Sequence, residues 1–144
     1  MFNDNIMFSK KVRWLIQKMS VVIHSNDAPE AIGPYVQGRL CGNTLYTSGC
    51  VAIDPHNPSR KIESVEEQML QCLNNMEAIL KEAGFAKTDV VKTTLFLLDM
   101  GDFQTVNKIY ADFFGDHKPC RTCVQAAKLP ASFKCEIECI AVKA

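Results

Sequence analysis

The segment from Ser64 to Gly84 is the clearest helix in this chain of 144 residues. Ser64 and Glu67 form a capping box, in which each side chain bonds a free backbone N–H group of the first turn. Gly84 follows the last turn, where a glycine commonly ends a helix. An apolar stripe recurs along the segment at spacings of three and four: Val65, Met69, Cys72, Leu73, Met76, Ile79, Leu80 and Ala83. This spacing predicts that one face of the helix packs against a core.

A buried strand and a second helix follow in the sequence. Residues 90–98 are apolar and rich in β-branched side chains, as in a well-buried strand. Asp102 is the expected N-cap of the next helix. The inner face of that helix carries Phe103, Val106, Tyr110, Phe113 and Phe114. Asn107 lies near this stripe, and a buried amide there is either a satisfied core group or a site residue.

Shorter strands are expected near the start of the folded region. Residues 21–24 form a short apolar run suited to a strand. Residues 35–41 and 44–48 flank the pair Gly42 and Asn43, which is a strong signal for a β-hairpin.

Residues 119–142 carry the charges that are hardest to place in a core. We expect two short strands joined at residues 129–132, with Arg121 in the first and Glu136 and Glu138 in the second. Charged groups in apolar strands are costly unless they are paired or used. A structural salt bridge from Arg121 to either glutamate and a functional site are both open hypotheses. Glu136 and Glu138 share a strand face, so spacing alone does not separate their roles.

The order of these elements is β, β, β, α, β, α, β, β, which predicts an α+β fold with a mixed sheet of about six strands. Strand–helix–strand crossovers are right-handed, so the two helices should lie on the same face of the sheet. The other face then lacks cover within the chain, although its strands carry apolar residues. A homo-oligomer would cover it, and the grooves between subunits would be natural ligand sites.

Charge limits the choice of partners. Basic and acidic residues are equal in number, but residues 1–20 carry a net charge of +3 and residues 21–144 a net charge of −3. A slightly acidic body offers no electrostatic footprint for a nucleic-acid backbone. The charge balance therefore disfavours nucleic acid as a partner.

The seven cysteines are an odd number and lie at irregular spacings, which indicates reduced thiols in an intracellular protein. Cys135 and Cys139 would lie about 13 Å apart on a strand. Cys120 and Cys123 would point to opposite faces. Neither pair can chelate one tetrahedral zinc ion without an added turn. We expect no metal site, and we interpret the cysteines as small apolar core residues.

Residues 1–20 are interpreted as an N-terminal extension, and residues 21–144 as a single domain. The extension mixes basic and apolar side chains and has no apolar run long enough to cross a membrane. It could be a weak mitochondrial presequence, or Met19 could be the usual start. The expected compartment is the cytoplasm, or the mitochondrion if the extension is a targeting sequence.

Five motifs occur in order along the folded region: 31–38 (AIGPYVQG), 46–49 (YTSG), 91–94 (VKTT), 102–107 (DFQTVN) and 119–138, which begins PCRTC and ends EIE. Together they resemble the Rid family of reactive intermediate deaminases, also called the YjgF or L-PSP family. The resemblance covers residues 21–144 and is nearest to the archetypal imine-deaminase subfamily.

This resemblance implies a chorismate-mutase-like fold and a homotrimer with a cleft at each subunit boundary. It implies hydrolysis of 2-iminobutanoate and 2-iminopropanoate, the products of pyridoxal-phosphate-dependent dehydratases, to 2-keto acids and ammonia. By motif, Arg121 binds the substrate carboxylate and Glu136 orients or activates the attacking water. The other cleft residues that it implies are Tyr35, Ser48, Gly49, Asn107 and Cys123.

The chemistry suits these residue types. A guanidinium fork matches a planar carboxylate and stays charged, and an iminium is electrophilic enough to need no cofactor. Lys118 and Cys120 depart from the family pattern at the rim of the cleft, so the preferred substrate side chain stays open. Two alternatives also stay open: a single-strand endoribonuclease or translation inhibitor, and a non-catalytic, carboxylate-binding or chaperone-like trimer.

Overall fold

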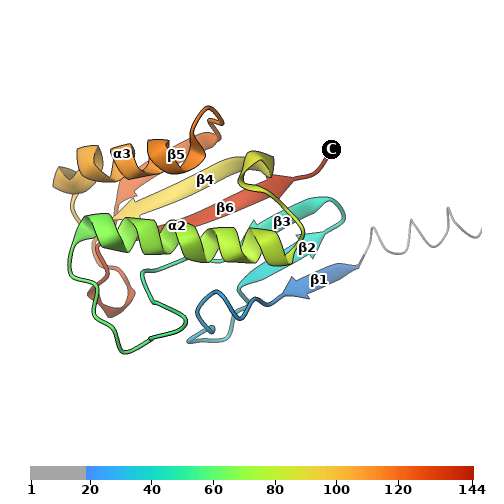
Figure 1. Cartoon of the computed structure of the whole chain (residues 1–144), viewed down its shortest axis with the longest axis horizontal. Helices are drawn as coiled ribbons and strands as arrows, with labels where there is room; N and C mark the ends of the chain where they lie inside the picture. Colours follow the sequence, from blue (N-terminus) through green and yellow to red (C-terminus); the bar gives the residue numbers. More distant parts are fainter. Residues whose placement is uncertain (1–18) are drawn as a thin grey trace, which may run out of the picture.

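The structure is a computed structural model, and it describes residues 19–144 (Figure 1). The strands are β1 Ser20–Ile23, β2 Gly38–Cys41, β3 Thr44–Thr47, β4 Val90–Leu97, β5 Cys120–Gln125 and β6 Cys135–Val142. The helices are α2 Val65–Glu82 and α3 Phe103–Phe114, with single 3-10 turns at Lys87–Asp89, Met100–Asp102 and Pro130–Ser132. None of the helices in the described part is long and apolar enough to cross a membrane. The predicted extension lies, up to Lys18, outside the described residues, and its boundary stays a prediction.

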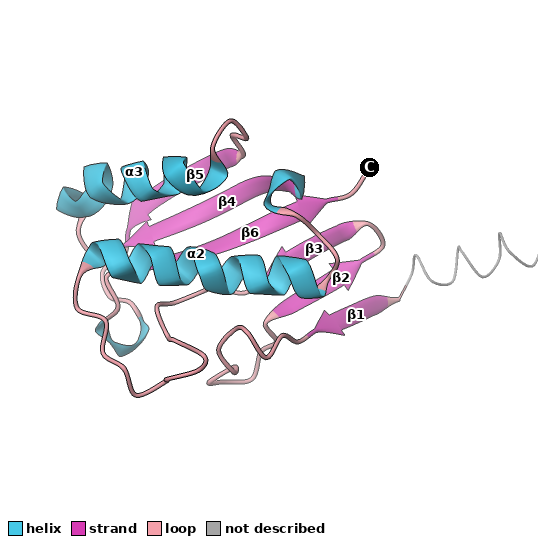
Figure 2. Cartoon of the chain, viewed as in Figure 1, coloured by secondary structure: helices cyan, strands magenta, loops and turns pink. Residues whose placement is uncertain are grey.

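The six strands form one mixed sheet in the order β1-β2-β3-β6-β4-β5. The pairs β1–β2, β2–β3, β3–β6 and β6–β4 are antiparallel, and β4 and β5 are parallel. Both crossover helices lie on the same face of this sheet (Figures 1 and 2). The α+β fold class and the one-sided placement of the helices are therefore confirmed.

Helix α2 lies over the middle of the sheet and forms much of the core. The hydroxyl of Ser64 accepts a hydrogen bond from the backbone N–H of Glu67 at 3.2 Å, as the sequence predicts. Gly84 ends the helix with φ +77°, a conformation that a side chain would strain. The predicted stripe is buried except for half-buried Ala83, and Met69, Cys72, Leu73, Met76 and Leu80 are fully inaccessible to solvent. Each such large apolar side chain contributes roughly 1.5–3 kcal/mol by leaving water.

The start of α3 differs from the prediction. Asp102 stands at the N-cap position, but its side chain makes no capping hydrogen bond. The carboxylate of Asp99 instead accepts the N–H of Gly101 at 2.7 Å, within the turn Met100–Asp102. This 3-10 turn leads directly into the helix, so the free N–H groups of the helix entrance lie one turn earlier than the sequence suggests.

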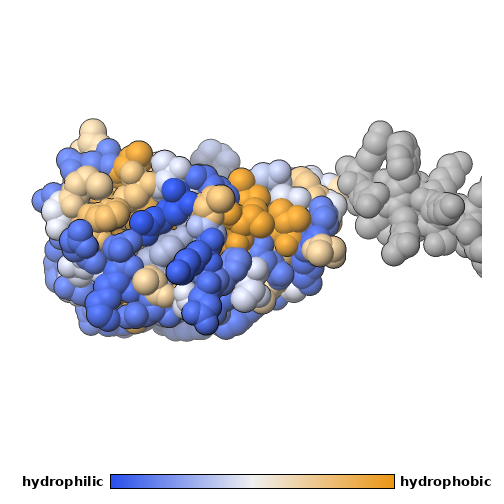
Figure 3. Space-filling view, turned by 90° about the horizontal axis from the view of Figure 1, so that it is seen from above, coloured by the Kyte–Doolittle hydropathy of each residue, from blue (hydrophilic) through white to orange (hydrophobic). Residues whose placement is uncertain are grey.

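The second face of the sheet has no cover from the described residues. Along β6, buried side chains facing the helices alternate with half-exposed ones: Glu136, Glu138, Ile140 and Val142 lie on the open face. The strand register places three exposed apolar side chains on the same face: Val22, Tyr46 and Val124. Seen from the side of α3 and β5, apolar residues gather in patches on a mostly hydrophilic surface (Figure 3). The open face of the sheet, with its exposed apolar side chains, is suited to a protein partner.

The cysteines differ in burial, and Cys123 is half-buried. Four are buried as expected: Cys50, Cys72, Cys135 and Cys139. Burial raises the pKa of the Cys139 thiol to about 12, so it stays protonated and packs as an apolar group. The interpretation is wrong for Cys41 and Cys120, which are exposed at strand ends. Within residues 19–144, no three His, Cys, Asp or Glu side chains are arranged to hold a metal ion.

Candidate functional site

Arg121 lies on the edge strand β5, where it is in register with Thr93 of β4, so its side chain points to the helix-covered face. Its guanidinium donates a hydrogen bond to Oδ1 of Asn107 at 2.8 Å. The same guanidinium lies 4.8 Å from the ring centroid of Tyr110 and 5.6 Å from that of Phe103. Within residues 19–144, the side chains that hydrogen-bond to or stack on the Arg121 guanidinium all come from helix α3.

These contacts fix the cation without neutralising it. Cation–π contacts of this kind are worth roughly 0.5–2 kcal/mol. The ring of Tyr110 is itself held by a buried hydrogen bond of 2.7 Å between its hydroxyl and that of Thr93. Among the described residues no carboxylate lies within ion-pair distance of Arg121. The hypothesis of a structural salt bridge to Glu136 or Glu138 is therefore wrong for the single chain, and the arginine can accept an anion.

Glu136 lies on the open face, against the turn that follows β3. Cys50 and Ile137 exchange backbone hydrogen bonds of 2.7 and 3.1 Å, which lay this turn on β6. The carboxylate of Glu136 then rests directly on Gly49, and a Cβ atom at position 49 would overlap with Oε1 of Glu136. Gly49 is therefore required by this close approach of backbone and carboxylate.

The carboxyl group of Glu136 has a raised pKa. Partial burial is the main cause, and the nearby negative charge of Glu138 adds to it. A carboxylate whose pKa lies above its usual range holds a proton more readily than an exposed one. Such a group is suited to act as a general base toward water.

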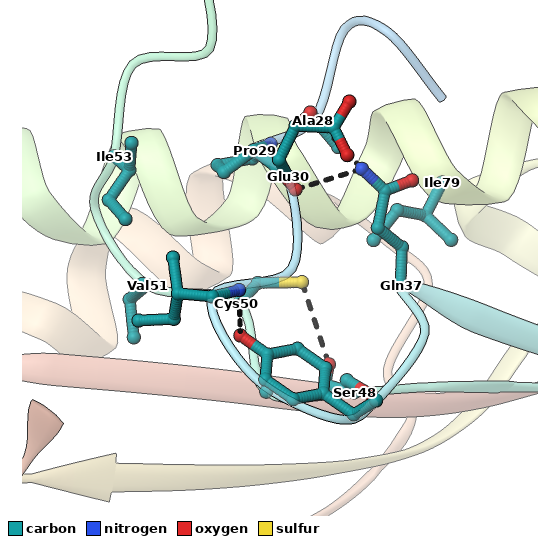
Figure 4. Close-up of a pocket in the computed structure, with 12 residues that line it drawn as sticks. Ala28, Pro29, Glu30, Gln37, Ser48, Cys50, Val51, Ile53 and Ile79 are labelled. Atoms are coloured by element: carbon teal, nitrogen blue, oxygen red, sulfur yellow. Dashed lines mark hydrogen bonds between the residues drawn. The ribbon is translucent and has the colours of Figure 1, made fainter. Parts of the chain in front are cut away.

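Tyr35, Ser48 and Gly49 meet at a small cavity of about 40 Å³ beside this turn (Figure 4). The hydroxyl of Ser48 donates to the carbonyl of Val36 at 2.6 Å, so its oxygen keeps lone pairs to accept a further bond. The hydroxyl of Tyr35 accepts the N–H of Ile32 at 3.3 Å and keeps its proton to donate. The cavity has room for a water molecule with polar partners.

The predicted site residues therefore form two groups. Arg121 and Asn107 lie together on the helix-covered face, and Cys123 follows on the same face of β5. Burial raises the pKa of the Cys123 thiol, and the charge of Arg121 partly offsets this. The second group is Tyr35, Ser48, Gly49 and Glu136.

One chain does not bring the two groups together. Arg121 is in register with Thr93, which is in register with Cys139, and Glu136 lies three residues further along β6. Two strand spacings and three residues of rise put the Cα atoms of Arg121 and Glu136 about 14 Å apart. Their side chains also point to opposite faces, so a ligand bound to one cannot reach the other in the same chain.

Two residues whose rings contact the Arg121 guanidinium are missed by sequence reasoning. Phe103 and Tyr110 fall on the apolar stripe of α3 and are predicted only as core. The signal that could have found them is Thr93, a polar residue at a fully buried position of β4 whose hydroxyl needs a partner.

The protein is thus a small α+β protein with a mixed sheet and helices on one face. Its polar site residues form two separate groups, one around an arginine at the edge of the sheet and one around a carboxylate on the open face. Residues 25–143 match the family model described as Endoribonuclease L-PSP. The 2-iminobutanoate/2-iminopropanoate deaminase of Salmonella typhimurium is 46% identical over 87% of this chain and 99% of that protein. The chain belongs to this family, also called the YjgF or Rid family.

Solved structures agree with this assignment. The YjgF gene product of Escherichia coli matches with a TM-score of 0.83 and 43% identity, over 86% of this chain and 99% of that one. Escherichia coli TdcF with bound serine matches with a TM-score of 0.83 and 41% identity, over 86% of this chain and 99% of that one. The resemblance predicted from the motifs is confirmed.

The contact between Gly49 and Glu136 can be tested by stability alone. Gly49→Ala should lower the free energy of unfolding by about 1–3 kcal/mol, because the added methyl group displaces a partly buried carboxylate. The cost should persist beside Glu136→Gln, which keeps the shape, and largely disappear beside Glu136→Ala. Urea unfolding of these variants measures the coupling. An equal cost of Gly49→Ala in all three backgrounds would show that the glycine is needed for another reason.

Proposed function

We propose that this protein hydrolyses reactive 2-imino acids, 2-iminobutanoate and 2-iminopropanoate, and their enamine tautomers, to 2-keto acids and ammonia. The observation that carries the proposal is Arg121, a fixed guanidinium without a carboxylate partner among the described residues. It is suited to bind the carboxylate that all these substrates share. The name of the relative in Salmonella typhimurium, which is 46% identical, supports the same reaction.

The complete site forms between two subunits of a homotrimer. Arg121, Asn107 and Cys123 come from one subunit, and the group around Glu136 comes from its neighbour. The argument rests on the roughly 14 Å and the sheet that separate the two groups within one chain. The open face of the sheet, with exposed Tyr46 and Val124, supplies the surface that such an assembly would cover.

The reaction then follows from the two groups. Arg121 binds the substrate carboxylate through two parallel hydrogen bonds and so fixes the imine carbon. Glu136 takes a proton from water as the water oxygen attacks that carbon, giving a carbinolamine. The proton then passes from Glu136 to the nitrogen. Glu136 takes the proton of the carbinolamine hydroxyl as the C–N bond breaks, so the 2-keto acid and ammonia leave, and ammonia takes up this last proton as ammonium. The hydroxyl of Ser48 accepts a hydrogen bond from the iminium N–H, and the hydroxyl of Tyr35 donates one to the carbinolamine oxygen. The balance needs one water and no external oxidant, reductant or cofactor.

The histidines do not favour RNA cleavage. His24 pairs with Glu30 at 3.4 Å, and His56 pairs with Asp27 at 3.3 Å, both at exposed positions. His117 bonds the backbone carbonyl of Val90 at 2.7 Å. None of these contacts joins a histidine to the residues of either group. The choice between the enzyme and a non-catalytic carboxylate-binding trimer depends on turnover.

Turnover can be measured with a threonine dehydratase that supplies the imine, with semicarbazide competing for it and 2-ketobutanoate formation as the readout. The wild-type protein should accelerate ketoacid release. Arg121→Ala should reduce kcat/KM by about 10- to 150-fold, because a hydrogen bond to a charged group is worth ~1.5–3 kcal/mol. Arg60→Ala, in an exposed loop, is the matched control and should keep full activity. A wild-type rate equal to that without added protein would refute the deaminase.

The divided site predicts complementation between inactive subunits. Arg121→Ala and Glu136→Gln chains, unfolded together and refolded at equal amounts, should recover about one quarter of the wild-type activity per site, since one arrangement in four restores both residues. Each variant refolded alone should keep only its own residual activity. Recovery no greater than the sum of the separate variants would place Arg121 and Glu136 of the same chain in one site.

The raised pKa of Glu136 predicts the pH dependence. Glu136 must be ionised to accept a proton, so kcat/KM should rise with pH as this carboxyl group ionises. Glu138→Gln removes a negative charge that raises the pKa of Glu136, and the acid limb should therefore move to lower pH. Glu82→Gln, at the exposed end of α2, is the matched control and should leave the limb unchanged. A limb that stays in place in Glu138→Gln would assign the titration to another group.

A further inference from the structure

Gln37 is a buried amide directly before β2, only 6% exposed, and its side chain is fully used. Its Oε1 accepts the backbone N–H of Ser25 at 2.6 Å. Its Nε2 lies within hydrogen-bond distance of three backbone carbonyl oxygens: Ser25 at 3.1 Å, Ala28 at 3.2 Å and Pro29 at 2.8 Å. One side chain thus ties the preceding loop to the start of β2, as the close-up shows for Gln37 and the loop that carries Ala28 and Pro29 (Figure 4).

Apart from the burial of Ala28 in the core and an exposed contact of Glu30 with His24, the segment 25–34 has few other attachments among the described residues. Its remaining hydrogen bonds stay within the segment and Tyr35, such as Ala28 to Ser25 at 3.4 Å and Tyr35 to Gly33 at 2.8 Å. The contact of Asp27 with His56 is exposed and therefore weak. Among the described residues, Gln37 provides the only buried hydrogen bonds between this segment and the sheet.

The same stretch of backbone also holds the turn after β3. The carbonyl of Gln37 accepts the N–H of Ser48 at 2.9 Å, and the carbonyl of Val36 accepts the Ser48 hydroxyl at 2.6 Å. Tyr35 immediately precedes this pair of carbonyls, and its ring is 47% exposed, so little packing restrains it. The side chain of Gln37 and the backbone of Gln37 therefore fix the two sides of the cavity that Tyr35 and Ser48 line.

We propose that Gln37 is a positioning residue for the imine hydrolysis: its amide holds the segment 25–34 so that Tyr35 faces Ser48 and the water handled by Glu136. The inference rests on the proposed function. An amide is required because the position needs an acceptor for Ser25 and a donor for the carbonyls of Ala28 and Pro29. A glutamate keeps the volume but presents a charge to those carbonyls, and a methionine keeps only the length.

The experiment compares Gln37→Glu and Gln37→Met with a second buried amide. Gln68 is 5% exposed, donates to the carbonyl of Ile62 at 2.7 Å and accepts the N–H of Lys134 at 2.8 Å, outside both groups of the site. Gln68→Met should therefore cost similar stability without loss of kcat. Both Gln37 variants should lower kcat about tenfold or more, since small misplacements of catalytic groups cost that much. Urea unfolding checks that all variants are folded under assay conditions.

Two further measurements separate positioning from a general loss of structure. Amide hydrogen exchange of residues 25–35 should become faster in Gln37→Met and stay unchanged in Gln68→Met. In a Tyr35→Ala background, Gln37→Met should lower kcat by less than about threefold, because the residue that it positions is gone.

The outcomes are distinct. Unchanged exchange in Gln37→Met, equal losses of kcat in Gln37→Met and Gln68→Met, or independent multiplication of the Gln37 and Tyr35 effects would each overturn the inference. Absence of turnover in the wild-type protein would instead overturn the proposed function, and with it the catalytic part of the inference.

Discussion

The place of β6 between β3 and β4 is the constraint on which the rest of the structure depends. It pairs Cys135–Val142 with two antiparallel neighbours and leaves β5 at the edge of the sheet. The turn after β3 can then lie on β6, which puts Gly49 under the carboxylate of Glu136. Because Arg121 is in register with Thr93, whose buried side chain faces the helices, Arg121 is directed to α3 instead of toward either glutamate.

The elements of this fold were predictable because each has a local cause. The stripe of α2, its serine cap and the glycine after it lie within 21 residues of sequence, and the structure confirms all three. Strand order has no such local cause. Consecutive strands are neighbours in about two-thirds of cases, which favoured Arg121 facing Glu136, yet β4 lies between their strands. The prediction that Asp102 caps α3 is wrong for a similar reason. Asp99 and Asp102 have the same side chain, and only the turn between them decides which carboxylate accepts a backbone N–H.

The site shows the same limit in its side chains. Hydrophobic periodicity identifies which residues are buried but says nothing of what their polar atoms contact. Tyr110 and Gln37 are both buried, and both are defined by hydrogen bonds to distant residues, Thr93 and the segment around Ser25. The motifs named Arg121, Glu136 and their companions. The motifs could not indicate how far apart Arg121 and Glu136 lie within one chain, because a motif records residue order and not the face on which each side chain lies.

This separation is itself chemically useful. If Arg121 and Glu136 met in one chain, they would form an ion pair, and the pKa of the glutamate would fall while the guanidinium was occupied. Instead the arginine is held by Asn107 and two aromatic rings, which leave its charge available. The pKa of the glutamate is raised by its partial burial and, less, by Glu138. The proposed carboxylate anchor and the proposed general base are thus kept apart within one chain. In the proposed trimer they would meet only across a subunit boundary, where the substrate carboxylate pairs with the arginine and a water lies between the substrate and the base.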